Sequence, residues 1–586
     1  MILSERLIDP IIVITRESGL IVARLGGSRM VRGVSSLLLA PSNSHQWVLD
    51  GQLIRPLPAD SPSVFAAMMQ GSDASNLSYG DALRLAKEEG QPIEVQLRES
   101  VLEAAREAAE HYPPALDVPG LNATLFPYQA RGIGWMDATL RQGSGLILAD
   151  EMGLGKTLQI IALLLLDLPA VASPALIICP TSLIANWVRE CERFAPSLSV
   201  IVHRGPHRAG IFRDFQKSNI VVTTYDTMVN DISIFSSLEW SWMICDEAQA
   251  LKNPDSNRRK SISTIPRRKT VPMTGTPVEN SLLDLWSLTD LAIPNMLGTR
   301  KQFEESYPDS LESAQALAEF TDPVILKRKV SEVAGDLPER IDIDVPLELD
   351  DDLAQHYRDV RKATLAKYPV AGALVATLQL QLVCAHPWLR APADPKDQLG
   401  ENSEIVQVRA FPLVTPKMER AAEIIREAFL NGQKVIIFSL FNRIGDLLKE
   451  VVPANTRLLW DAINGSTPQP DRQTIIDKFT AHAGPACLVL NPKAAGAGLN
   501  ITAATVVIHF TPVWNPAIEA QASARAHRRG QTRPVTVYRL FYKETVEDVM
   551  IDRALWKTDL ANESVPTSTR DTSDLRRALE VEPTAL

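Results

Sequence analysis

Two blocks of short apolar segments, each segment followed by a helical pattern, constrain the fold of this 586-residue chain more than any other feature. The first block comprises LILAD (146–150), ALIICP (175–180), NIVVTTY (219–225), WMICDE (242–247) and TVPMTGT (270–276). The second comprises KVIIFS (434–439), ACLVLN (486–491), TVVIHF (505–510) and VTVYRL (535–540). Buried strands that alternate with helices are typical of parallel sheets covered on both faces. The chain is therefore predicted to be an α/β protein with two parallel-sheet lobes.

The segments around these blocks give five predicted regions. They are an N-terminal accessory region (1–115), the first lobe (116–299), a mostly helical insertion and linker (300–414), the second lobe (415–560) and a polar tail (561–586). Short apolar stretches broken by Gly, Pro and Ser characterise the accessory region, and its helical run VLEAAREAAEHY ends at Pro113 and Pro114. The polar composition of the tail predicts weak order, apart from a short helix at LRRALE.

Composition argues against several classes of protein. No apolar run approaches the ~18 residues needed to span a bilayer, and the N-terminus lacks a signal-peptide pattern. The five cysteines are far apart and form no CxxC pair. We therefore expect neither a disulfide framework nor a structural zinc site, and a reducing cytoplasm as the location.

The charge distribution leaves nucleic-acid binding open. A net charge of −10 argues against coating nucleic acid through global charge. Local basic runs nevertheless occur at 252–269, 327–329 and 525–533, and phosphate contacts need only a suitably placed patch. The alternative for any isolated run is a solvated surface.

A glycine-rich turn follows the first strand of the first block. DEMGLGKT leads into the helical segment LQIIALLLL, which is the strand–loop–helix context of a phosphate-binding loop. Gly153 and Gly155 allow backbone N–H groups to converge on phosphate oxygens. Lys156 would pair with the β- and γ-phosphates of ATP, and Thr157 would bind Mg²⁺. Asp150 stands where the strict pattern has its first glycine.

Two further groups of charged residues complete the predicted chemistry. The strand WMIC ends at Asp246 and Glu247, which suit a Mg²⁺ ligand and a base that orients the attacking water. In the second block, QASARAHRRGQ presents Arg525 and Arg528 three residues apart, which predicts that they share one helical face. Such arginines can neutralise charge that develops on a γ-phosphate.

With these motifs in order, residues 120–580 resemble the Swi/Snf family of superfamily-two helicase-like ATPases, of a bacterial or viral type. The matching segments of the first lobe are LFPYQARGIGWM, DEMGLGKT, CPTSLIANWVRECERF, VVTTYDTM, DEAQALKNPDS and TGTPVENSLLDLWSL. KRKVSEVAGDLPER and LQLVCAHPWL match the insertion, and INGSTPQPDRQTIIDKF, LNPKAAGAGLNITAA, VWNP and ARAHRRGQ match the second lobe. The resemblance implies two RecA-like lobes with a helical insertion between them.

The resemblance also implies roles for individual residues. Gln129 would read the adenine, and Gln521 would face ATP together with the arginines. The implied residues that couple hydrolysis to movement are Thr274, Gly275, Thr276 and Gly498. The implied DNA contacts are Thr181, Ser182, Asn186, Trp187, Thr224, Lys493, Gly496 and Trp514.

The sequence departs from the family pattern at three positions. Gln249 replaces the histidine of the acidic motif and can still form hydrogen bonds. Ala524 replaces the aspartate that usually precedes the first arginine, and Thr511 replaces the aspartate usual before the WNP segment. The two latter changes bear on the rate or on its coupling to DNA.

Three functional hypotheses follow. The first is an ATP-driven translocase on double-stranded DNA that remodels or displaces bound proteins. Its settings would be anti-phage defence, RNA-polymerase recycling or repair, and it would dock a protein partner through residues 1–115. The second is a strand-separating DNA or RNA helicase, which the insertion segments weigh against. The third is a binding module locked by nucleotide, which Lys156, Glu247 and the two arginines make improbable.

Overall fold

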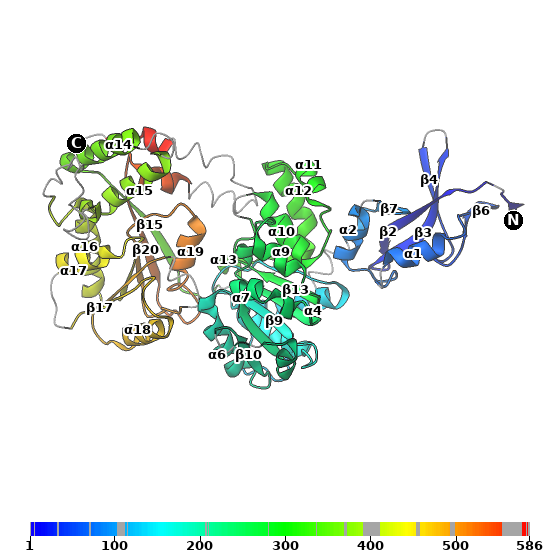
Figure 1. Cartoon of the computed structure of the whole chain (residues 1–586), viewed down its shortest axis with the longest axis horizontal. Helices are drawn as coiled ribbons and strands as arrows, with labels where there is room; N and C mark the ends of the chain where they lie inside the picture. The colour runs from blue at the N-terminus through cyan, green and yellow to red at the C-terminus, as the bar shows by residue number, and fades with distance from the viewer. Residues whose placement is uncertain are drawn as a thin grey trace. The chain divides into compact units, whose positions relative to one another are not determined.

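Two parallel sheets, one in each half of the chain, organise the computed structural model (Figure 1). The chain divides into two compact units. Unit 1 consists of 1–151, 155–329 and 563–566, and unit 2 consists of 152–154, 330–562 and 567–586. The structure describes residues 2–4, 6–31, 34–69, 72–88, 90–101, 103, 112–113, 115–205, 208, 210–278, 281–333, 335, 337–367, 372–390, 411–452, 457–492, 499–553, 577–581 and 583. Most of VLEAAREAAEHY lies outside these ranges.

The sheet of the first lobe has the order β10-β11-β9-β12-β13-β8-β14, and all its pairings are parallel. Its strands are β8 (Ile147–Leu148), β9 (Ala175–Cys179), β10 (Val200–His203), β11 (Ile220–Thr224), β12 (Trp240–Asp246), β13 (Arg267–Met273) and β14 (Ile325–Leu326). Every residue of β9 and β11 is buried, as expected for strands covered on both faces.

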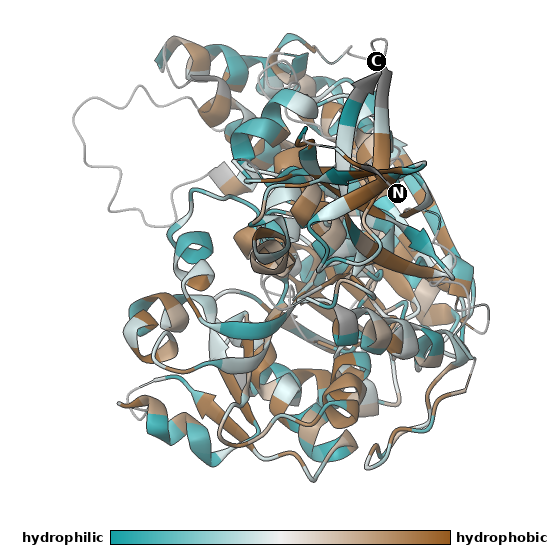
Figure 2. Ribbon diagram, turned by 90° about the vertical axis from the view of Figure 1, so that its right-hand side faces the viewer, coloured by the Kyte–Doolittle hydropathy of each residue, from teal (hydrophilic) through white to brown (hydrophobic). Residues whose placement is uncertain are grey.

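Helices surround this sheet. They are α4 (Pro127–Gln142), α5 (Lys156–Leu166), η1 (Thr181–Leu183), α6 (Ile184–Phe194), η2 (Phe212–Lys217), α7 (Tyr225–Asn230), α8 (Ile232–Phe235), η3 (Ala248–Leu251), α9 (Asn257–Ser263), α10 (Leu282–Ala292), α11 (Arg300–Ser306), α12 (Leu311–Thr321) and η4 (Asp322–Val324). In Figure 2 many helices carry both hydrophilic and apolar faces, which is the pattern of helices packed on a core.

The accessory region folds into two small sheets and is part of unit 1. One sheet has the order β1-β6-β5 and the other β4-β3-β2-β7. The elements are β1 (Ile2–Leu3), β2 (Asp9–Glu17), β3 (Leu20–Val31), β4 (Val34–Leu39), β5 (Trp47–Asp50), β6 (Leu53–Pro56), α1 (Ser61–Met69), α2 (Tyr79–Lys87) and β7 (Glu94–Leu97). The sequence predicted the region but not this β-rich fold.

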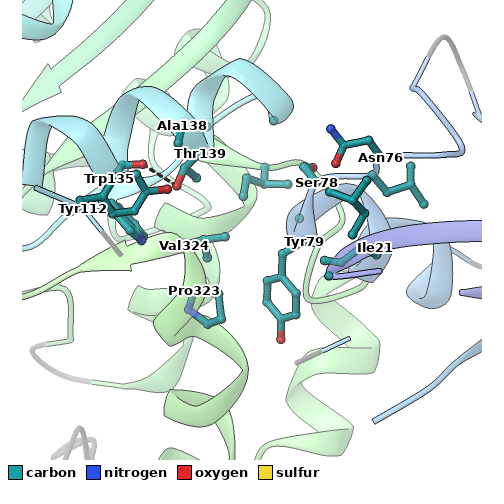
Figure 3. Close-up of a pocket in the computed structure, with 17 residues that line it drawn as sticks. Ile21, Asn76, Ser78, Tyr79, Tyr112, Trp135, Ala138, Thr139, Pro323 and Val324 are labelled. Atoms are coloured by element: carbon teal, nitrogen blue, oxygen red, sulfur yellow. Dashed lines mark hydrogen bonds between the residues drawn. The ribbon is translucent and has the colours of Figure 1, made fainter. Parts of the chain in front are cut away.

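The start of α2 packs against the first lobe. A Cβ atom on Gly80 would lie 2.8 Å from Cδ1 of Ile293, so the helix approaches closely only because this position is glycine. A cavity of about 160 Å³ beside this contact is lined from both sides, by Ile21, Ser78 and Tyr79 and by Trp135, Thr139 and Val324, among others (Figure 3). The accessory region is therefore joined to the first lobe by packing as well as by the chain.

The sheet of the second lobe has the order β15-β20-β19-β16-β18-β17 and is also parallel throughout. Its strands are β15 (Arg340–Leu347), β16 (Val435–Phe438), β17 (Leu459–Ile463), β18 (Ala486–Leu490), β19 (Val506–His509) and β20 (Val535–Tyr542). The helices of this unit are α13 (Val330–Val333), α14 (Asp351–Lys367), α15 (Gly372–Ala385), η5 (Pro387–Arg390), α16 (Pro416–Leu430), α17 (Arg443–Val451), α18 (Gln469–Ala481) and α19 (Pro516–Ser523). The predicted α/β class with two parallel-sheet lobes is confirmed.

The predicted insertion of residues 300–414 does not stand by itself. Its strand β14 joins the first sheet and β15 joins the second, and the units divide between Lys329 and Val330. Helices α14 and α15 contribute to a core cluster that also contains Tyr542 and Met550. The mostly helical pattern of 300–414 hid these edge strands, one of which has only two residues.

The polar tail contains a docked turn. Residues 577–580 are helical, and Ala578 is fully buried in the cluster that includes Tyr357 of α14. Arg361 donates hydrogen bonds to the carbonyl oxygens of Leu579 and Val581 at 3.0 and 3.2 Å. In Figure 1 this red segment lies beside α14. The described part of the helix predicted at LRRALE, residues 577–580, is therefore helical and packed, although polar composition predicted weak order.

Candidate functional site

Several predicted site residues lie at one edge of the first sheet. Lys156 follows β8, Thr181 follows β9, Thr224 ends β11, Asp246 ends β12 and Thr274 follows β13. Because these strands are parallel, their carboxyl ends meet at the same edge, where ligands bind in open α/β sheets. The fold therefore gathers residues that are far apart in the sequence.

The phosphate loop has the backbone that its glycines predict. Gly153 and Gly155 have φ values of +95° and +74°, a region that other residues avoid. Helix α5 begins at Lys156, so its unpaired N–H groups and dipole favour an anion at this end. The Lys156 ammonium donates to the carbonyl oxygen of Asp150 at 2.7 Å. The loop, the lysine and Thr157 fit the phosphates of a nucleotide.

Gln129 lies directly against this loop. Its side chain is 2% exposed, and its amide oxygen accepts a hydrogen bond from the Phe126 N–H at 3.1 Å, which closes the capping box of α4. A Cβ atom on Gly155 would lie 2.7 Å from Nε2 of Gln129. The structure thus brings Gln129 to the loop, and its reading of adenine stays a prediction.

Asp246 is held by its surroundings in a defined orientation. Oδ2 accepts a hydrogen bond from the Trp187 indole N–H at 2.8 Å, and Oδ1 accepts one from the Glu247 N–H at 2.9 Å. Burial, and then the neighbouring Glu247, raise the pKa of Asp246 to about 7, while Trp187 and Lys156 act in the opposite direction. A carboxylate that is costly to ionise when empty gains by binding a cation. The site therefore suits Mg²⁺.

Trp187 lies in the core of the first lobe, whereas the sequence suggested a surface contact to DNA. Its side chain is fully buried, and its indole N–H supports Asp246. Tyr225 adds support from the other side, because its hydroxyl donates to the Asp246 carbonyl oxygen at 2.8 Å. Neither residue was predicted to support the acidic pair.

Glu247 is linked by hydrogen bonds to the segment predicted to couple hydrolysis to movement. Its Oε2 accepts from Gln249 Nε2 at 2.8 Å, and Gln249 Oε1 accepts from the Thr274 hydroxyl at 3.3 Å. The Thr274 hydroxyl also accepts from the Thr276 N–H at 3.2 Å. Glu247 has a φ of +52°, a strained value of the kind found at functional sites. Gln249 thus joins Glu247 to Thr274 within the first lobe.

The other predicted DNA contacts of the first lobe differ in exposure. Thr181 is exposed, and Ser182 and Asn186 are half-buried. Thr224 is only 6% exposed, and its hydroxyl accepts from the Thr227 N–H at 3.1 Å as the N-cap of α7. A capping role explains this threonine without DNA.

The basic run 252–269 is largely structural. Arg259 is buried and donates to Asp290 at 2.7 Å, and Arg267 donates to backbone carbonyls at the end of α9, including Ile265 at 2.9 Å. Arg268 and Lys269 form salt bridges with Glu239 and Asp167. Arg259 and Arg267 are therefore engaged within the protein, whereas Lys260 and Arg268 of the same run are exposed.

The two arginines of the second lobe do not lie on a helical face. Helix α19 ends at Ser523, and Arg525 and Arg528 follow in successive turns. We call residues 524–531 the arginine turn. Ala524, where the family has aspartate, is the C-cap of α19. The sequence favours a helix through Arg525 and Arg528, because this alanine-rich segment has no helix breaker before Gly530.

The side chain of Gln531 stabilises the arginine turn through hydrogen bonds to backbone groups. Its Nε2 donates to the carbonyl oxygens of Thr502, Ala504 and Ala526 at 2.9 to 3.1 Å. Its Oε1 accepts from two backbone N–H groups, those of Thr532 and Arg533. Its position at the end of the quoted motif ARAHRRGQ was the only signal in the sequence.

The remaining predictions for the second lobe vary in outcome. Lys493, Gly496 and Gly498 lie outside the described residues, and Gln521 is half-buried on α19. Trp514 is half-buried, with the Arg553 guanidinium 5.5 Å from its ring centre, and it packs on the cluster around Tyr357. The Thr511 hydroxyl accepts from the Leu440 N–H at 2.8 Å. Threonine therefore satisfies a backbone group at this departure from the pattern.

The described part of the chain has neither a metal-binding cluster of side chains nor a membrane-spanning helix. Within the described ranges, no cluster of three or more His, Cys, Asp and Glu side chains could hold a metal, and the five cysteines are buried thiols. A Mg²⁺ ion that keeps waters and shares phosphate oxygens needs fewer protein ligands. None of the helices in those ranges has the length and apolar character to cross a membrane.

Two family models and several known proteins match the chain. Residues 128–389 match the SNF2-related domain, and residues 416–530 match the helicase conserved C-terminal domain. An uncharacterized ATP-dependent helicase of Mycoplasma genitalium is 35% identical over 72% of this chain and 40% of its own length. A putative ATP-dependent helicase/translocase of Bacillus subtilis is 32% identical over 76% of this chain and 49% of its own length. The chain thus spans less than half the length of these two curated relatives.

A solved structure also resembles the chain. The SWI2/SNF2 ATPase core of Sulfolobus solfataricus in complex with double-stranded DNA is 29% identical, and the alignment covers 80% of this chain and 99% of that one with a TM-score of 0.39. The two domain matches lie in the order that the motifs predict, and between them they contain all the catalytic residues predicted from the sequence. The chain belongs to the Swi/Snf family of superfamily-two helicase-like ATPases.

Proposed function

We propose that this chain hydrolyses ATP to move along double-stranded DNA and thereby remodels or displaces proteins bound to it. The observation that carries the proposal is the grouping of Lys156, Asp246 and Glu247 at one sheet edge, with Glu247 linked through Gln249 to Thr274. A binding module would need the phosphate loop. It would have no use for a positioned base joined to a second loop.

The residues of the first lobe divide the chemistry. Lys156 leaves the Asp150 carbonyl to pair with the β- and γ-phosphates, and Glu247 orients and deprotonates the attacking water. Thr157 and Asp246 would hold Mg²⁺, which supplies neutralising charge to the phosphate oxygens when bound. Gln249 fixes the carboxylate of Glu247 and transmits its position to Thr274. In this proposal Gly275, Thr276 and Gly498 also belong to the coupling machinery.

The second lobe contributes the cationic groups. We assign Arg525 and Arg528 to charge that develops on the γ-phosphate, a role that can be worth ~10³–10⁵ in rate. Gln521 would assist at the nucleotide. Because these residues belong to the other unit, hydrolysis would require the two lobes to meet, and repeated closing and opening would drive movement on the DNA.

Site-directed variants test the assignment. Lys156→Ala should abolish ATP turnover by removing the phosphate contact, and Glu247→Gln should abolish turnover while nucleotide binding remains. ATPase rates and equilibrium binding of a fluorescent ATP analogue check both statements. Unchanged turnover in either variant would refute the site.

A strand-separating helicase is the second candidate, and the names of the bacterial relatives favour it. The two functions make different demands on the track. A translocase on duplex DNA displaces a bound protein without releasing a single strand, whereas a helicase releases a labelled strand from a partial duplex. Strand-displacement and protein-displacement assays on the same DNA distinguish them.

The biological setting is proposed from the accessory region, residues 1–115. The accessory region carries no residue of the predicted chemistry, and it exposes leucines such as Leu3, Leu7 and Leu20. We assign residues 1–115 to docking a protein partner, in RNA-polymerase recycling, anti-phage defence or repair. Recovery of the same partner with the full chain but not with a chain lacking residues 1–115 would support this assignment. Equal recovery with both would contradict it.

A further inference from the structure

Arg328 occupies a prepared position behind the phosphate loop. Its guanidinium donates to both carboxylate oxygens of Asp150, from Nε to Oδ1 at 2.9 Å and from Nη2 to Oδ2 at 2.5 Å. Nη2 also donates to Oε1 of Gln159 at 2.7 Å, and Nη1 donates to the carbonyl oxygen of Tyr128. Bidentate pairing of this kind fixes orientation as well as charge.

The surrounding residues are shaped to admit this side chain. A Cβ atom on Gly132 of α4 would lie 2.6 Å from Nη1 and 2.8 Å from Nη2 of Arg328. The Tyr128 ring lies below the guanidinium, with its centre 5.2 Å away. Glycine at position 132 therefore provides the space that the guanidinium fills.

Arg328 also accounts for the aspartate at the first position of the phosphate loop. The Asp150 carboxylate has no solvent exposure, and a buried charge is tolerated only when it is paired. Its partners are Arg328 and the Gln159 amide, which donates at 3.1 Å. The unusual residue of the loop and the arginine about 180 positions later are one ion pair.

The contacts of Arg328 reach three segments of the first lobe that would hold a nucleotide. Asp150 begins the phosphate loop and its carbonyl oxygen receives Lys156, Gln159 lies on α5, and Tyr128 precedes Gln129. The backbone strengthens the connection, because the Glu151 N–H donates to the Arg328 carbonyl oxygen at 2.9 Å. The segment of unit 1 that contains Arg328 ends one residue later, at Lys329. The segment that leaves the first unit is thus fastened to the loop.

We propose that Arg328 is a positioning residue for nucleotide binding, which holds the phosphate loop in register with α4 and α5 through Asp150. The proposal rests on the proposed function, since it concerns the same nucleotide site. The arginine stands in the chain where the connection to the second unit begins. A pull on that connection would therefore act directly on the loop that binds phosphate.

The test is equilibrium binding of fluorescently labelled ADP to the full chain, with thermal unfolding measured in parallel. Arg328→Gln and Asp150→Asn should each weaken binding about tenfold, because each breaks the charged pair. The double variant should bind no more weakly than either single variant, because both substitutions remove one interaction. A hundredfold loss in the double variant, or wild-type affinity in the single variants, would overturn the proposal.

A second pair of variants covers the case in which a broken ion pair prevents folding. Gly132→Ala retains every charge but displaces the guanidinium, so it should also weaken binding of labelled ADP. Gly134→Ala makes the same change two residues along α4, where the atom nearest to the new Cβ is Cδ1 of Tyr112 at 3.2 Å, and should bind as wild type does. Equal affinities in the two glycine variants would contradict the role of Arg328. Failure of the wild-type chain to bind the probe would instead contradict the proposed function.

Discussion

At the scale of single residues, the acidic pair at the end of β12 depends on neighbours outside its own motif. Trp187 and Tyr225 fix Asp246, and Gln249 fixes Glu247. The motif residues themselves could be predicted from the sequence, because glycine, lysine and adjacent carboxylates have recognisable chemistry. Their supports could not, since a buried tryptophan that donates one hydrogen bond looks like any other aromatic residue of a helix.

The pH dependence of the site should report the Trp187 hydrogen bond. Asp246 binds Mg²⁺ only when ionised, so metal-dependent nucleotide binding should fall as the pH drops through its pKa of about 7. The indole N–H favours the ionised form. Trp187→Phe should therefore raise the pKa and shift the binding curve to higher pH. Binding of labelled ATP with Mg²⁺, measured from about pH 6 to 9, checks the direction.

Trp47→Phe is the matched control, because Trp47 lies in the accessory region on β5. It should leave the curve in place. A Trp187→Phe curve that coincides with the wild type, or moves to lower pH, would show that the indole does not tune Asp246.

Gln249 should matter for turnover more than for binding. Gln249→Ala removes the bond that fixes Glu247 and should lower kcat by at least about tenfold, since a general base contributes ~10²–10⁴ when positioned. Lys156 and the loop remain, so the affinity for labelled ATP should stay near the wild-type value. Gln249→His restores a donor at this position and should recover part of the rate. A loss of affinity without a loss of kcat would contradict the assigned role.

At the scale of elements, prediction succeeded where the apolar pattern was strong. It failed where an element was short or joined a sheet whose other strands lie far away in the sequence. The buried strands were recognisable because runs such as ALIICP and ACLVLN are apolar throughout. Strand β15 was missed although RIDIDVPL alternates charged and apolar residues, the pattern of a half-buried strand, because the segments around it are mostly helical. The local sequence of the arginine turn favours a helix. The prediction was wrong because hydrogen bonds from Gln531, rather than local sequence, determine the path of this segment.

The arginine turn should be sensitive to Gln531. Gln531→Ala leaves three carbonyl groups and two N–H groups without their side-chain partner, and it should lower the free energy of unfolding by ~1–3 kcal/mol. It should also reduce ATP turnover, because Arg525 and Arg528 lose their support. Chemical denaturation and steady-state ATPase rates measure the two effects.

Gln473→Ala provides a comparison on α18, where the side chain of this half-buried glutamine donates a hydrogen bond to Asp477. That variant should change neither quantity measurably. If Gln531→Ala unfolded at the same denaturant concentration as Gln473→Ala and kept full turnover, the turn would not depend on Gln531.

At the scale of the whole molecule, the five predicted regions reduce to two units. The accessory region packs on the first lobe, and the insertion is shared between the lobes. Sequence reasoning separated these regions by composition, and composition carries no information about which surfaces meet. The Gly80 contact with Ile293 illustrates this, since a glycine inside a short helix gives no sign of its neighbour.

A larger side chain at position 80 should disrupt the contact with Ile293, and a smaller side chain at position 293 should restore it. Gly80→Val should overpack against Ile293, at a cost of ~1–3 kcal/mol, and should increase hydrogen exchange at the carboxyl end of α4, which lines the cavity. Adding Ile293→Ala to Gly80→Val should restore protection there. Unchanged exchange in Gly80→Val would mean that the accessory region does not pack on the lobe in solution.

The proposal that this chain is an ATPase driven by double-stranded DNA can be tested through the ATPase rate of the full chain with different polynucleotides. The rate should be measured without nucleic acid and with duplex DNA, single-stranded DNA or RNA at matched nucleotide concentration, with Glu247→Gln as the inactive control. We expect duplex DNA to stimulate hydrolysis most strongly and Glu247→Gln to abolish the rate under every condition. Stimulation by RNA alone, or a rate indifferent to every polynucleotide, would contradict it.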